Sequence, residues 1–347
     1  KQDETTRALD AIEGESKGLL QYLPRFAYEL AEFAYTIPSY FRLRKAEQAI
    51  SPAVIYERYS LFYFAGLWLK KKTGLPLIVE VNSPLRRERT EHGGLSLKRL
   101  AAWTERKVWR GADALLPVTQ VLAEDLLAIG IAPEKITVIP NGVTERWLAP
   151  VDALPIIKKH QLEGKLVLGF TGFVRDWHGV DKVLDYMANN PERRLHLLLV
   201  GDGPAVPDLK AQATRLGLAD SFTVTGVVQR EDVAKHVAAF DIALQPRVTE
   251  YASPLKLMEY MALSRPILAP DMANIREVLV DGENALLFNA NDDVAMGRTL
   301  DRLVHDQTLC ETLGKAARQT VLDREMTWDG NARKVAEIAA QLIAKNS

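Results

Sequence analysis

Short apolar runs that alternate with helical patterns are the feature that most constrains how this chain can fold. From Lys165 onward six such runs recur, at 166–170, 195–200, 222–224, 242–244, 266–269 and 285–288. Continuous apolar strands are expected where helices cover both faces of a parallel sheet. The second half of the chain is therefore predicted to form a doubly wound α/β domain.

The first half contains a second, shorter series of the same kind. Its predicted strands are 53–56, 77–81, 114–118 and 136–139. Its predicted helices lie near 61–72, 95–110 and 120–129. The fold class predicted for the chain is therefore α/β, with two Rossmann-like doubly wound lobes facing a central cleft. A length of 347 residues suits two domains.

The segment between the two series sets the predicted domain boundaries. The turn at 140–143 closes the first series, and the stretch up to Pro155 has little periodicity, which suits a hinge. We expect an N-terminal lobe at 1–145 and a C-terminal lobe at 146–326. A last amphipathic helix within 327–347 is expected to pack back across the hinge.

Residues 1–52 contain no predicted strand and are typical of helices rich in aromatic side chains. A Rossmann half ordinarily opens with a strand and a tight turn. We therefore expect the first strand or two of the N-terminal lobe to precede Lys1.

Composition and charge exclude several classes of protein. A net charge of −1 removes any global electrostatic case for binding nucleic acid. The single cysteine, Cys310, excludes a disulfide within the chain and a cysteine metal site, so a reducing, cytoplasmic setting is expected. The longest uncharged apolar run near the front, Leu61 to Leu69, is far short of the roughly twenty residues that span a bilayer.

The segment Ser253-Pro254-Leu255-Lys256 has the pattern of a helix start that can hold an anion. Ser253 is a good N-cap and Pro254 suits the first helical position. The amides of Leu255 and Lys256 then lack partners within the helix, and the helix dipole favours a negative charge at this end. Lys256 adds a full positive charge, which suits a diphosphate.

Glu259 lies three residues after Lys256, on the same face of the predicted helix. A carboxylate there can accept two hydroxyl hydrogen bonds, as a ribose diol would supply. The alternative for this segment is an ordinary capped amphipathic helix with an exposed Lys and Glu. The ten residues 253–262 do not decide between the two interpretations.

A glycine-containing turn follows the first strand of the second half, at 169–179. Glycines such as Gly172 at the end of a strand let a ligand approach the backbone, and Arg175 can form a forked contact with phosphate. In a plain βα turn, Arg175 would instead be solvated. His178 is more often structural than functional in such a position.

Two weaker signals lie at the ends of later strands. Gly201-Asp202-Gly203-Pro204 is a tight turn at the rim where α/β sheets bind ligands, and Val228 lies in an apolar turn at 225–229 that could contact a flat base. The dinucleotide fingerprint G-x-G-x-x-G, the P-loop, the G-x-S-x-G elbow and a metal-binding His pair are absent from the sequence. No bound metal is expected.

The order of these segments resembles the retaining, nucleotide-sugar-dependent glycosyltransferases of the GT-B fold, family 4, also called glycosyl transferases group 1. The resemblance covers about residues 53–345. Its motifs in this sequence are W-H-G at 177–179, G-D-G-P at 201–204, F-T-V-T-G at 222–226, S-P-L-K-L-M-E-Y-M-A at 253–262 and I-P-N-G-V at 139–143. So many matches in order are far more specific than any one alone.

The resemblance implies a role for each candidate residue. The groups implied around the donor diphosphate are Gly172, Arg175, the Leu255 amide behind the Ser253 cap, and Lys256. Glu259 would hold the ribose and Val228 would lie near the base. The donor would be a UDP- or GDP-linked sugar, no further cofactor or metal is implied, and the first lobe would bind a glycan or lipid-linked acceptor.

Three positions depart from the family pattern. Phe173 stands where an Arg commonly follows the glycine, so Arg175 must supply that charge. Tyr251 stands where the family has its first glutamate, and Glu250 is its neighbour and the candidate for orienting the sugar. Asn82 replaces a histidine that often follows the strand at 77–81.

The acceptor side leaves alternatives open. Residues 84–110 contain eight Lys or Arg against three Glu, and 17–45 is aromatic and basic. This charge is either a solvated helical face or a surface for an anionic membrane or a lipid-linked acceptor. We expect a cytoplasmic transferase of cell-envelope or exopolysaccharide synthesis, peripheral to the inner face of the membrane in the second case. A nucleotide-sugar-binding scaffold without catalysis and a nucleotide-sugar epimerase are the alternatives.

Overall fold

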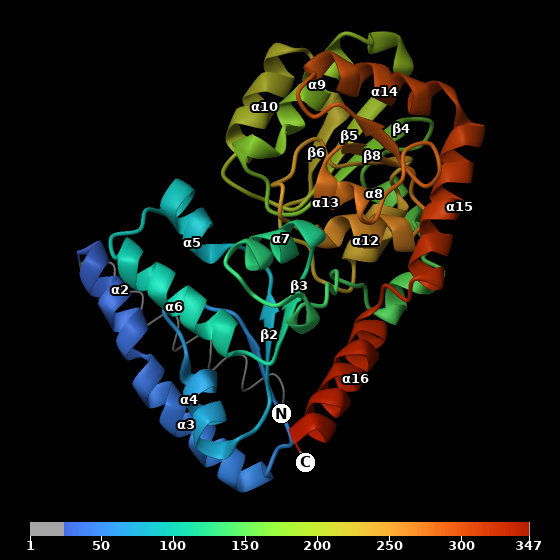
Figure 1. The fold of residues 1–347 in the computed structure, drawn as a ribbon. Coiled ribbons are helices and arrows are strands. Elements are labelled where there is room, and N and C mark those ends of the chain that lie inside the picture. The colour runs from blue at the N-terminus through green and yellow to red at the C-terminus, as the bar shows by residue number, and fades with distance from the viewer. Residues whose placement is uncertain (1–23, 347) are drawn as a thin grey trace. The chain divides into compact units, whose positions relative to one another are not determined.

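The computed structural model of the protein describes residues 24–346 (Figure 1). The chain divides into two units. Unit 1 holds the described residues of Lys1–Pro117, Leu122–Val138 and Glu337–Ser347, and unit 2 holds Val118–Val121 and Ile139–Ala336. The predicted assignment of the first lobe to the acceptor and the second to the donor stays a prediction.

Unit 1 is built on a parallel three-stranded sheet in the order β1-β2-β3, with Ile55 opposite Leu77 and Ile78 opposite Ala114. Its elements are α2 (Arg25–Ala34), α3 (Thr36–Ile50), β1 (Ile55–Arg58), α4 (Ala65–Thr73), β2 (Leu77–Val81), α5 (Leu85–Glu88), η1 (Arg89–Gly93), α6 (Lys98–Gly111), β3 (Ala114–Pro117), α7 (Gln120–Ala128) and η2 (Pro133–Lys135). α7 begins at the boundary with unit 2.

The helical prediction for the start of the chain is confirmed over the described residues, because α2 and α3 fill 25–50 with a single break at Tyr35. Aromatic side chains join these helices to α4 and its N-cap residue, Phe64. Phe33 packs on Phe64, with ring centroids 5.4 Å apart, and Tyr40 packs edge-on against Trp68 of α4 at 5.9 Å. The prediction of a missing first strand concerns residues outside the described range.

The prediction of a fourth strand at 136–139 is wrong. Only Ile136 pairs with the sheet, in an isolated parallel bridge to Leu115, and the amide of Thr137 donates to the Leu115 carbonyl. Pro140 follows, and it has no N–H with which to continue a ladder. The segment therefore leaves the sheet after a single bridge.

Unit 2 has a parallel six-stranded sheet covered by helices. Its elements are η3 (Glu145–Leu148), α8 (Leu154–Lys159), β4 (Leu166–Thr171), η4 (Asp176–His178), α9 (Val180–Ala188), η5 (Pro191–Arg193), β5 (Leu195–Val200), α10 (Val206–Arg215), η6 (Ala219–Ser221), β6 (Phe222–Val224), α11 (Val233–Ala238), β7 (Ile242–Leu244), α12 (Leu255–Ala262), β8 (Ile267–Pro270), α13 (Ala273–Arg276), β9 (Leu286–Phe288), α14 (Asp293–His305), α15 (Gln307–Asp323) and α16 (Trp328–Asn346). The last residues of α16 group with unit 1.

The strand order of unit 2 is β6-β5-β4-β7-β8-β9, and every pair is parallel. The chain therefore reverses direction across the sheet between β4 and β7, which is where doubly wound folds bind ligands at the carboxyl ends of the strands. Two hydrophobic clusters cover the sheet, one containing residues of α9, α10 and α14 and the other residues of α8, α11 and α12. The predicted α/β fold class is confirmed.

The turn at 140–143 is tied to the start of α16. The amide of Val143 donates to the Met326 carbonyl at 3.1 Å, and Asn331 Nδ2 donates to the Pro140 carbonyl at 2.7 Å. A side chain at Gly142 would place its Cβ 2.7 Å from the Thr327 carbonyl carbon. Glycine is thus required here by close backbone approach, and the predicted hinge role stays a prediction.

No helix within residues 24–346 combines the length and apolar character that crossing a bilayer requires.

Candidate functional site

A cavity of about 440 Å³ lies in unit 2 at the carboxyl ends of β4 and β5, beside the start of α12. Its lining combines strand-end glycines, apolar side chains and two opposite charges. The lining residues are Thr171, Gly172, Phe173, Val200, Gly201, Asp202, Val227, Val228, Val233, Leu255, Lys256 and Glu259. Five of the eight predicted site residues therefore share one cavity: Gly172, Val228, Leu255, Lys256 and Glu259.

Glycines bring the loops after β4 and β5 into contact. The amide of Gly172 donates to the Val200 carbonyl at 2.9 Å, and the amide of Val174 donates to the Asp202 carbonyl at 2.8 Å. Gly201 has φ +139°, and a Cβ there would overlap the Gly172 carbonyl oxygen. The turn at 201–204 therefore packs against the turn that contains Gly172. Its residues Gly201 and Asp202 line the cavity.

The start of α12 differs from the sequence prediction. The N-cap is Pro254, with an extended ψ of 114°, and it makes no side-chain capping bond. Ser253 Oγ instead accepts from the amide of Asn141 at 3.1 Å, and the Ser253 carbonyl accepts from Asn141 Nδ2 at 2.7 Å. The prediction of Ser253 as N-cap was wrong because the serine hydroxyl is used to hold the 140–143 turn.

The amides predicted to face the ligand keep that capacity. The first amide with a partner at the helix start is that of Leu257, which donates to the Pro254 carbonyl at 3.0 Å. The amides of Leu255 and Lys256 come before it, and both residues line the cavity. Farther along, Tyr260 Oη accepts from the Thr171 amide at 2.9 Å, which fixes α12 against the end of β4.

Lys256 is held in the cavity wall by apolar surroundings. Its Nζ lies 3.8 Å from the centroid of the Phe170 ring, a cation–π contact. Within residues 24–346 the ammonium makes no hydrogen bond or close ion pair. Burial lowers the pKa of Lys256 to about 7, while the nearby Glu259 carboxylate raises it. The side chain is thus a cation without a counterion in contact, as an anion site requires.

Glu259 is likewise without a hydrogen-bond partner among the described residues. Burial raises the pKa of its carboxyl group to about 7, and the charges of Lys256, Arg230 and Arg146 lower it. Both arginines line a smaller hollow of about 100 Å³ that shares Val233, Leu255 and Glu259 with the main cavity.

Arg146 and Arg230 were missed by sequence reasoning. Arg146 lies in the segment interpreted as a hinge, and Arg230 directly follows the apolar turn at 225–229 that contains Val228. Nothing local marks either as part of a site. The tertiary structure brings both near Glu259.

Arg175, Glu250 and Ser253 lie outside the cavity lining. Arg175 is exposed, and its guanidinium carbon lies 5.6 Å from the ring centroid of Phe173, which does line the cavity. Glu250 is exposed on the loop between β7 and α12. Their predicted catalytic roles stay predictions.

His178 lies close enough to Lys256 and Arg175 for both charges to lower its pKa. Burial lowers its pKa to about 4, with the Lys256 charge as the next cause. Its Nδ1 accepts from the Arg175 amide at 2.9 Å, and its ring stacks on Trp177 with centroids 3.9 Å apart. The histidine is therefore neutral near pH 7 and shapes the turn, as its structural interpretation anticipated.

No group of three or more His, Cys, Asp or Glu in the described part of the chain is arranged to hold a metal ion.

Family models match both halves of the chain. The model described as glycosyl transferases group 1 matches residues 154–320, and the model described as glycosyl transferase 4-like domain matches residues 6–142. The first model covers every residue that lines the 440 Å³ cavity. The residues of the smaller hollow that lie outside it are Gly142, Val143, Thr144, Arg146, Trp147 and Trp328.

Curated relatives belong to the same class. The chain is 23% identical over 254 residues to the alpha-D-kanosaminyltransferase of Streptomyces kanamyceticus, covering 70% of this chain and 65% of the relative. It is 31% identical over 218 residues to the D-inositol 3-phosphate glycosyltransferase of Stackebrandtia nassauensis, covering 58% and 48%. The matches thus span about half to two thirds of these relatives.

Solved structures share the fold. Anabaena HepE in complex with UDP and glucose superposes with a TM-score of 0.68 at 18% identity, covering 80% of this chain and 75% of that one. The sucrose-phosphate synthase of Thermosynechococcus elongatus superposes with a TM-score of 0.76 at 19% identity, covering 93% and 81%. With both family models matched in order along a GT-B fold, the chain belongs to the group 1 family of glycosyltransferases.

Proposed function

We propose that the protein transfers a sugar from a nucleoside-diphosphate sugar, UDP- or GDP-linked, to an acceptor hydroxyl. The observation that carries the proposal is the Lys256 ammonium beside the Leu255 and Lys256 amides at the start of α12, none of which has a hydrogen-bond partner within residues 24–346. A helix N-terminus and a cation together form an anion site. Glu259, one turn deeper, offers a carboxylate to a ribose diol, and Val228 offers an apolar contact to the base.

Transfer requires the protein to stabilise the departing nucleoside diphosphate. As the bond between sugar and phosphate breaks, negative charge grows on the diphosphate while the sugar carbon becomes oxocarbenium-like. We propose that Lys256, the α12 amides and Arg175 supply the opposing positive charge without a divalent metal. Because the same charge favours the transition state over the ground state, this contribution raises kcat.

We further propose that transfer retains the configuration of the sugar, and that the acceptor is a glycan or a lipid-linked sugar of cell-envelope or exopolysaccharide synthesis. Family membership supports retention, and the basic segment 84–110 supports an acceptor that carries phosphate. The lone Cys310 favours a cytoplasmic site of action, since nothing in the chain requires an oxidising compartment.

A panel of radiolabelled UDP- and GDP-sugars tests the donor proposal. Slow hydrolysis of one donor, without acceptor, is expected in the presence of EDTA as well as in its absence. Lys256→Met, which keeps the apolar stem and removes the charge, should abolish that hydrolysis. Failure of every donor to bind or turn over would contradict the proposal, and activity strictly dependent on a divalent cation would contradict its metal-independent part.

A nucleotide-sugar-binding protein without turnover is the second candidate. It is favoured by one observation, that neither Arg175 nor Glu250 lines the cavity. Calorimetric binding of a nucleotide sugar with no hydrolysis and no transfer to any acceptor would select it over the transferase.

A further inference from the structure

Three apolar side chains that line the 440 Å³ cavity of unit 2 are exposed to solvent. Phe173 is 61% exposed, Val227 86% and Leu255 47%. Folded proteins usually bury apolar groups of this size, and those that gather exposed in a concave site mark a surface that a ligand covers. The cavity therefore suits a ligand that has apolar faces as well as charge.

The backbone on both sides of Phe173 is fixed. The Gly172 amide donates to the Val200 carbonyl at 2.9 Å, and the Val174 amide donates to the Asp202 carbonyl at 2.8 Å. The side chain of Val174 is fully buried in one of the two hydrophobic clusters of unit 2. The Phe173 ring thus extends from a rigid segment, which holds it in place before a ligand binds.

The order of the strands places Phe173 at one end of the cavity. The lining loops follow β6, β5 and β4, which are neighbours in that order in the sheet. Residues 227–228 follow β6, 201–202 follow β5, and 172–173 follow β4. Because these strands are parallel, the three loops lie at the same edge of the sheet. The loop after β5 therefore separates Phe173 from Val228, the proposed contact of the base.

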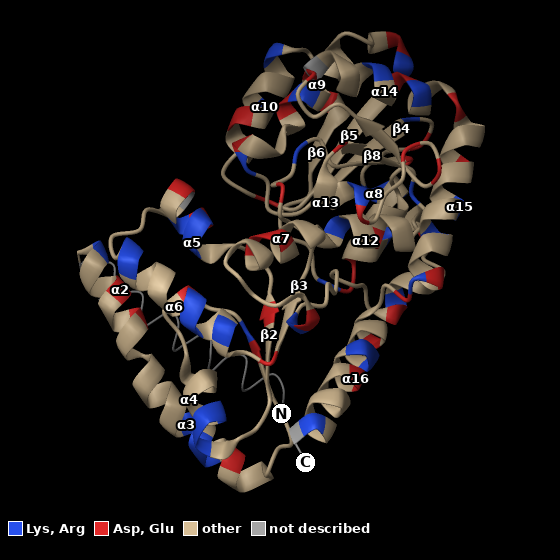
Figure 2. Cartoon of the chain, in the orientation of Figure 1, with Lys and Arg blue, Asp and Glu red and all other residues tan. Residues whose placement is uncertain are grey.

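The positive charge of Lys256 lies at the same end of the cavity as Phe173. A Cβ added to Gly172 would lie 3.5 Å from Lys256 Nζ, and Phe173 is the next residue of the chain. Figure 2 shows the charged residues of α12, which include Lys256 and Glu259. A diphosphate on Lys256 whose base contacts Val228 leaves the sugar at the end of the cavity where Phe173 lies.

The Phe173 ring is already in contact with a cation. The guanidinium carbon of Arg175 lies over the ring, 5.6 Å from its centroid. The face of an aromatic ring carries partial negative charge, so it attracts any group with partial positive charge. The C–H groups on one face of a sugar ring are of this kind, because each carbon there bears an electronegative oxygen.

We propose that Phe173 contacts the C–H face of the transferred sugar and adds affinity for the nucleotide sugar that the free nucleoside diphosphate does not gain. The inference rests on the proposed function, because it assigns a binding residue to the sugar of that donor. The nucleobase is the competing partner of the ring, and the experiment separates the two.

Calorimetric titration compares nucleotide sugars with their parent nucleotides: UDP-glucose and UDP-N-acetylglucosamine with UDP, and GDP-mannose with GDP. The donor is the nucleotide sugar of this set that the wild type hydrolyses or, if it hydrolyses none, binds most tightly. Phe173→Ala should weaken the affinity for the donor about three- to tenfold, as expected for an aromatic contact. The affinity for the parent nucleotide should not change. Phe173→Tyr keeps the ring and should bind the donor like the wild type.

Phe41→Ala is the matched control. Phe41 lies on α3 in unit 1, is 65% exposed and does not line the cavity. Its replacement removes a ring of the same type and similar exposure, so both affinities should stay those of the wild type.

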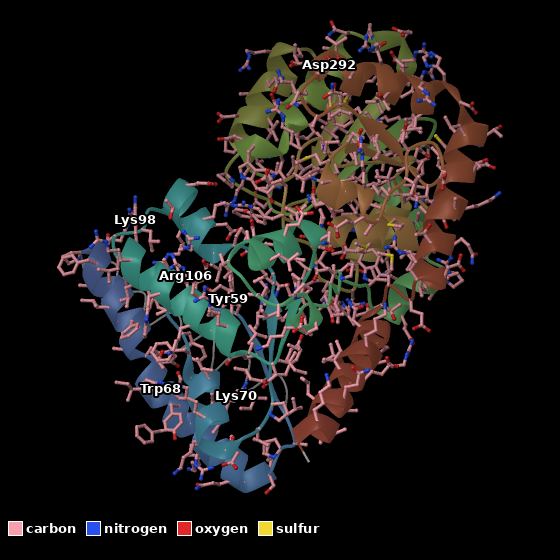
Figure 3. All side chains as sticks on the ribbon, in the orientation of Figure 1. Tyr59, Trp68, Lys70, Lys98, Arg106 and Asp292 are labelled. Atoms are coloured by element: carbon pink, nitrogen blue, oxygen red, sulfur yellow. The ribbon has the colours of Figure 1, made fainter. Side chains whose placement is uncertain are left out.

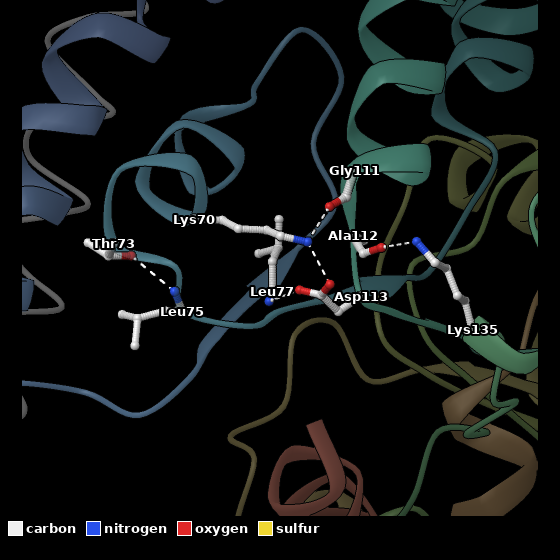
Figure 4. A network of polar contacts seen from close by, with 8 residues as sticks. All are labelled: Lys70, Thr73, Leu75, Leu77, Gly111, Ala112, Asp113 and Lys135. Carbon is white, nitrogen blue, oxygen red and sulfur yellow. Dashed lines mark hydrogen bonds and ion pairs between the residues drawn. The ribbon is translucent and has the colours of Figure 1, made fainter. Parts of the chain in front are cut away.

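A second control separates the local contact from a general loss of stability. Lys70, labelled in Figure 3, donates from Nζ to the Gly111 carbonyl at 2.8 Å and pairs with Asp113 at 2.6 Å in unit 1 (Figure 4). Lys70→Met should therefore destabilise unit 1, as thermal denaturation would show. It should leave the affinities for the donor and for its parent nucleotide unchanged.

Three results would overturn the inference while the wild type binds both nucleotides. They are an equal weakening of donor and parent nucleotide in Phe173→Ala, an unchanged donor affinity in that variant, and a Phe173→Tyr variant as weak as Phe173→Ala. The first of them would place the ring against the base or the phosphates. A wild type that binds no nucleotide and no nucleotide sugar would instead contradict the proposed function, and this inference with it.

Discussion

At the scale of single residues, the candidate site depends on two half-buried side chains of opposite charge that line one cavity. Lys256 and Glu259 lie one turn apart on α12, and burial moves the pKa of each toward 7. Neither makes a close bond to another described residue. Both are therefore available to a ligand that brings an anion to one and hydroxyl groups to the other.

Replacing Lys256 should mainly impair turnover. Lys256→Ala removes a charge whose value grows as the diphosphate departs, so kcat should fall with a loss of roughly 2–4 kcal/mol of transition-state stabilisation. Steady-state kinetics with the donor identified from the panel would measure this. Lys210→Ala, at an exposed position of α10, is the control, and wild-type turnover in Lys256→Ala would contradict the diphosphate site.

The affinity for UDP should depend on pH through Lys256. Its pKa of about 7 means that the side chain is largely neutral above pH 7, and a bound diphosphate raises that pKa. Binding should therefore take up a proton, and affinity should fall as the pH rises from 7 to 9. Calorimetry in buffers of different ionisation enthalpy measures the uptake, and Lys256→Ala should abolish it. A pH-independent affinity in the wild type would show that the ammonium does not contact the phosphate.

Glu250 can be tested separately from the cavity. If it orients the donor sugar, Glu250→Gln should reduce sugar turnover and leave the affinity for free UDP nearly unchanged, because Glu250 does not line the cavity. Calorimetry beside a turnover assay distinguishes the two effects. Unchanged turnover would exclude Glu250 from catalysis and leave the sugar-orienting residue to be found among the cavity groups.

At the scale of elements, the site is made by three segments that end at one edge of the unit 2 sheet. The β4 and β5 loops interlock through Gly172 and Gly201, and α12 is fixed to β4 by the bond from the Thr171 amide to Tyr260. A rigid wall of this kind holds the α12 amides in place before a ligand arrives, which is what electrostatic preorganisation requires.

The interlocked loops should tolerate no side chain at Gly201. Gly201→Ala places a Cβ against the Gly172 carbonyl and should lower the free energy of unfolding by about 1–3 kcal/mol more than a matched control. Gly217→Ala is that control, because its φ of +71° is also positive but no atom lies within 4 Å of the added Cβ. Urea denaturation measures both, and equal losses would show that conformation alone matters.

At the scale of the whole molecule, each unit has its own sheet and hydrophobic core. The buried histidines belong to unit 2, and burial lowers the pKa of both His178 and His196 to about 4. Both are therefore neutral in the folded unit, whereas in the unfolded chain they titrate near 6.5. Their contribution to stability is full above pH 6.5 and is lost as the pH falls through about 4.

As the pH falls from 7 to 5, these two histidines should destabilise unit 2, while Glu259, whose pKa burial raises to about 7, takes up a proton in the folded unit and contributes in the opposite direction. Between pH 7 and pH 5 each of these histidines should cost about 2 kcal/mol of unfolding free energy. His196→Gln should reduce that pH dependence, and His305→Gln, at an exposed position of α14, should not. Urea denaturation across this pH range is the measurement. A slope in His196→Gln equal to that of the wild type would contradict the assignment.

The sequence by itself determined the two βα series, the α/β class and the segment that starts α12, because strand and helix periodicity and a Lys beside a helix start are local properties. It also indicated the residues of the cavity that lie at strand ends, such as Gly172 and Val228. The strand predicted from the sequence at 136–139 is wrong, because this apolar segment leaves the sheet after the single bridge of Ile136 to Leu115.

Only the tertiary structure decided which partners these residues meet. Ser253 is taken by Asn141, which is 112 positions away, and so cannot cap its own helix. Arg146 and Arg230 lie near Glu259, whereas the Arg175 guanidinium lies over the ring of Phe173. Hydrogen bonds and charges between distant segments depend on how the loops pack, and burial sets the pKa of Lys256. No local segment of the sequence determines this packing or this burial.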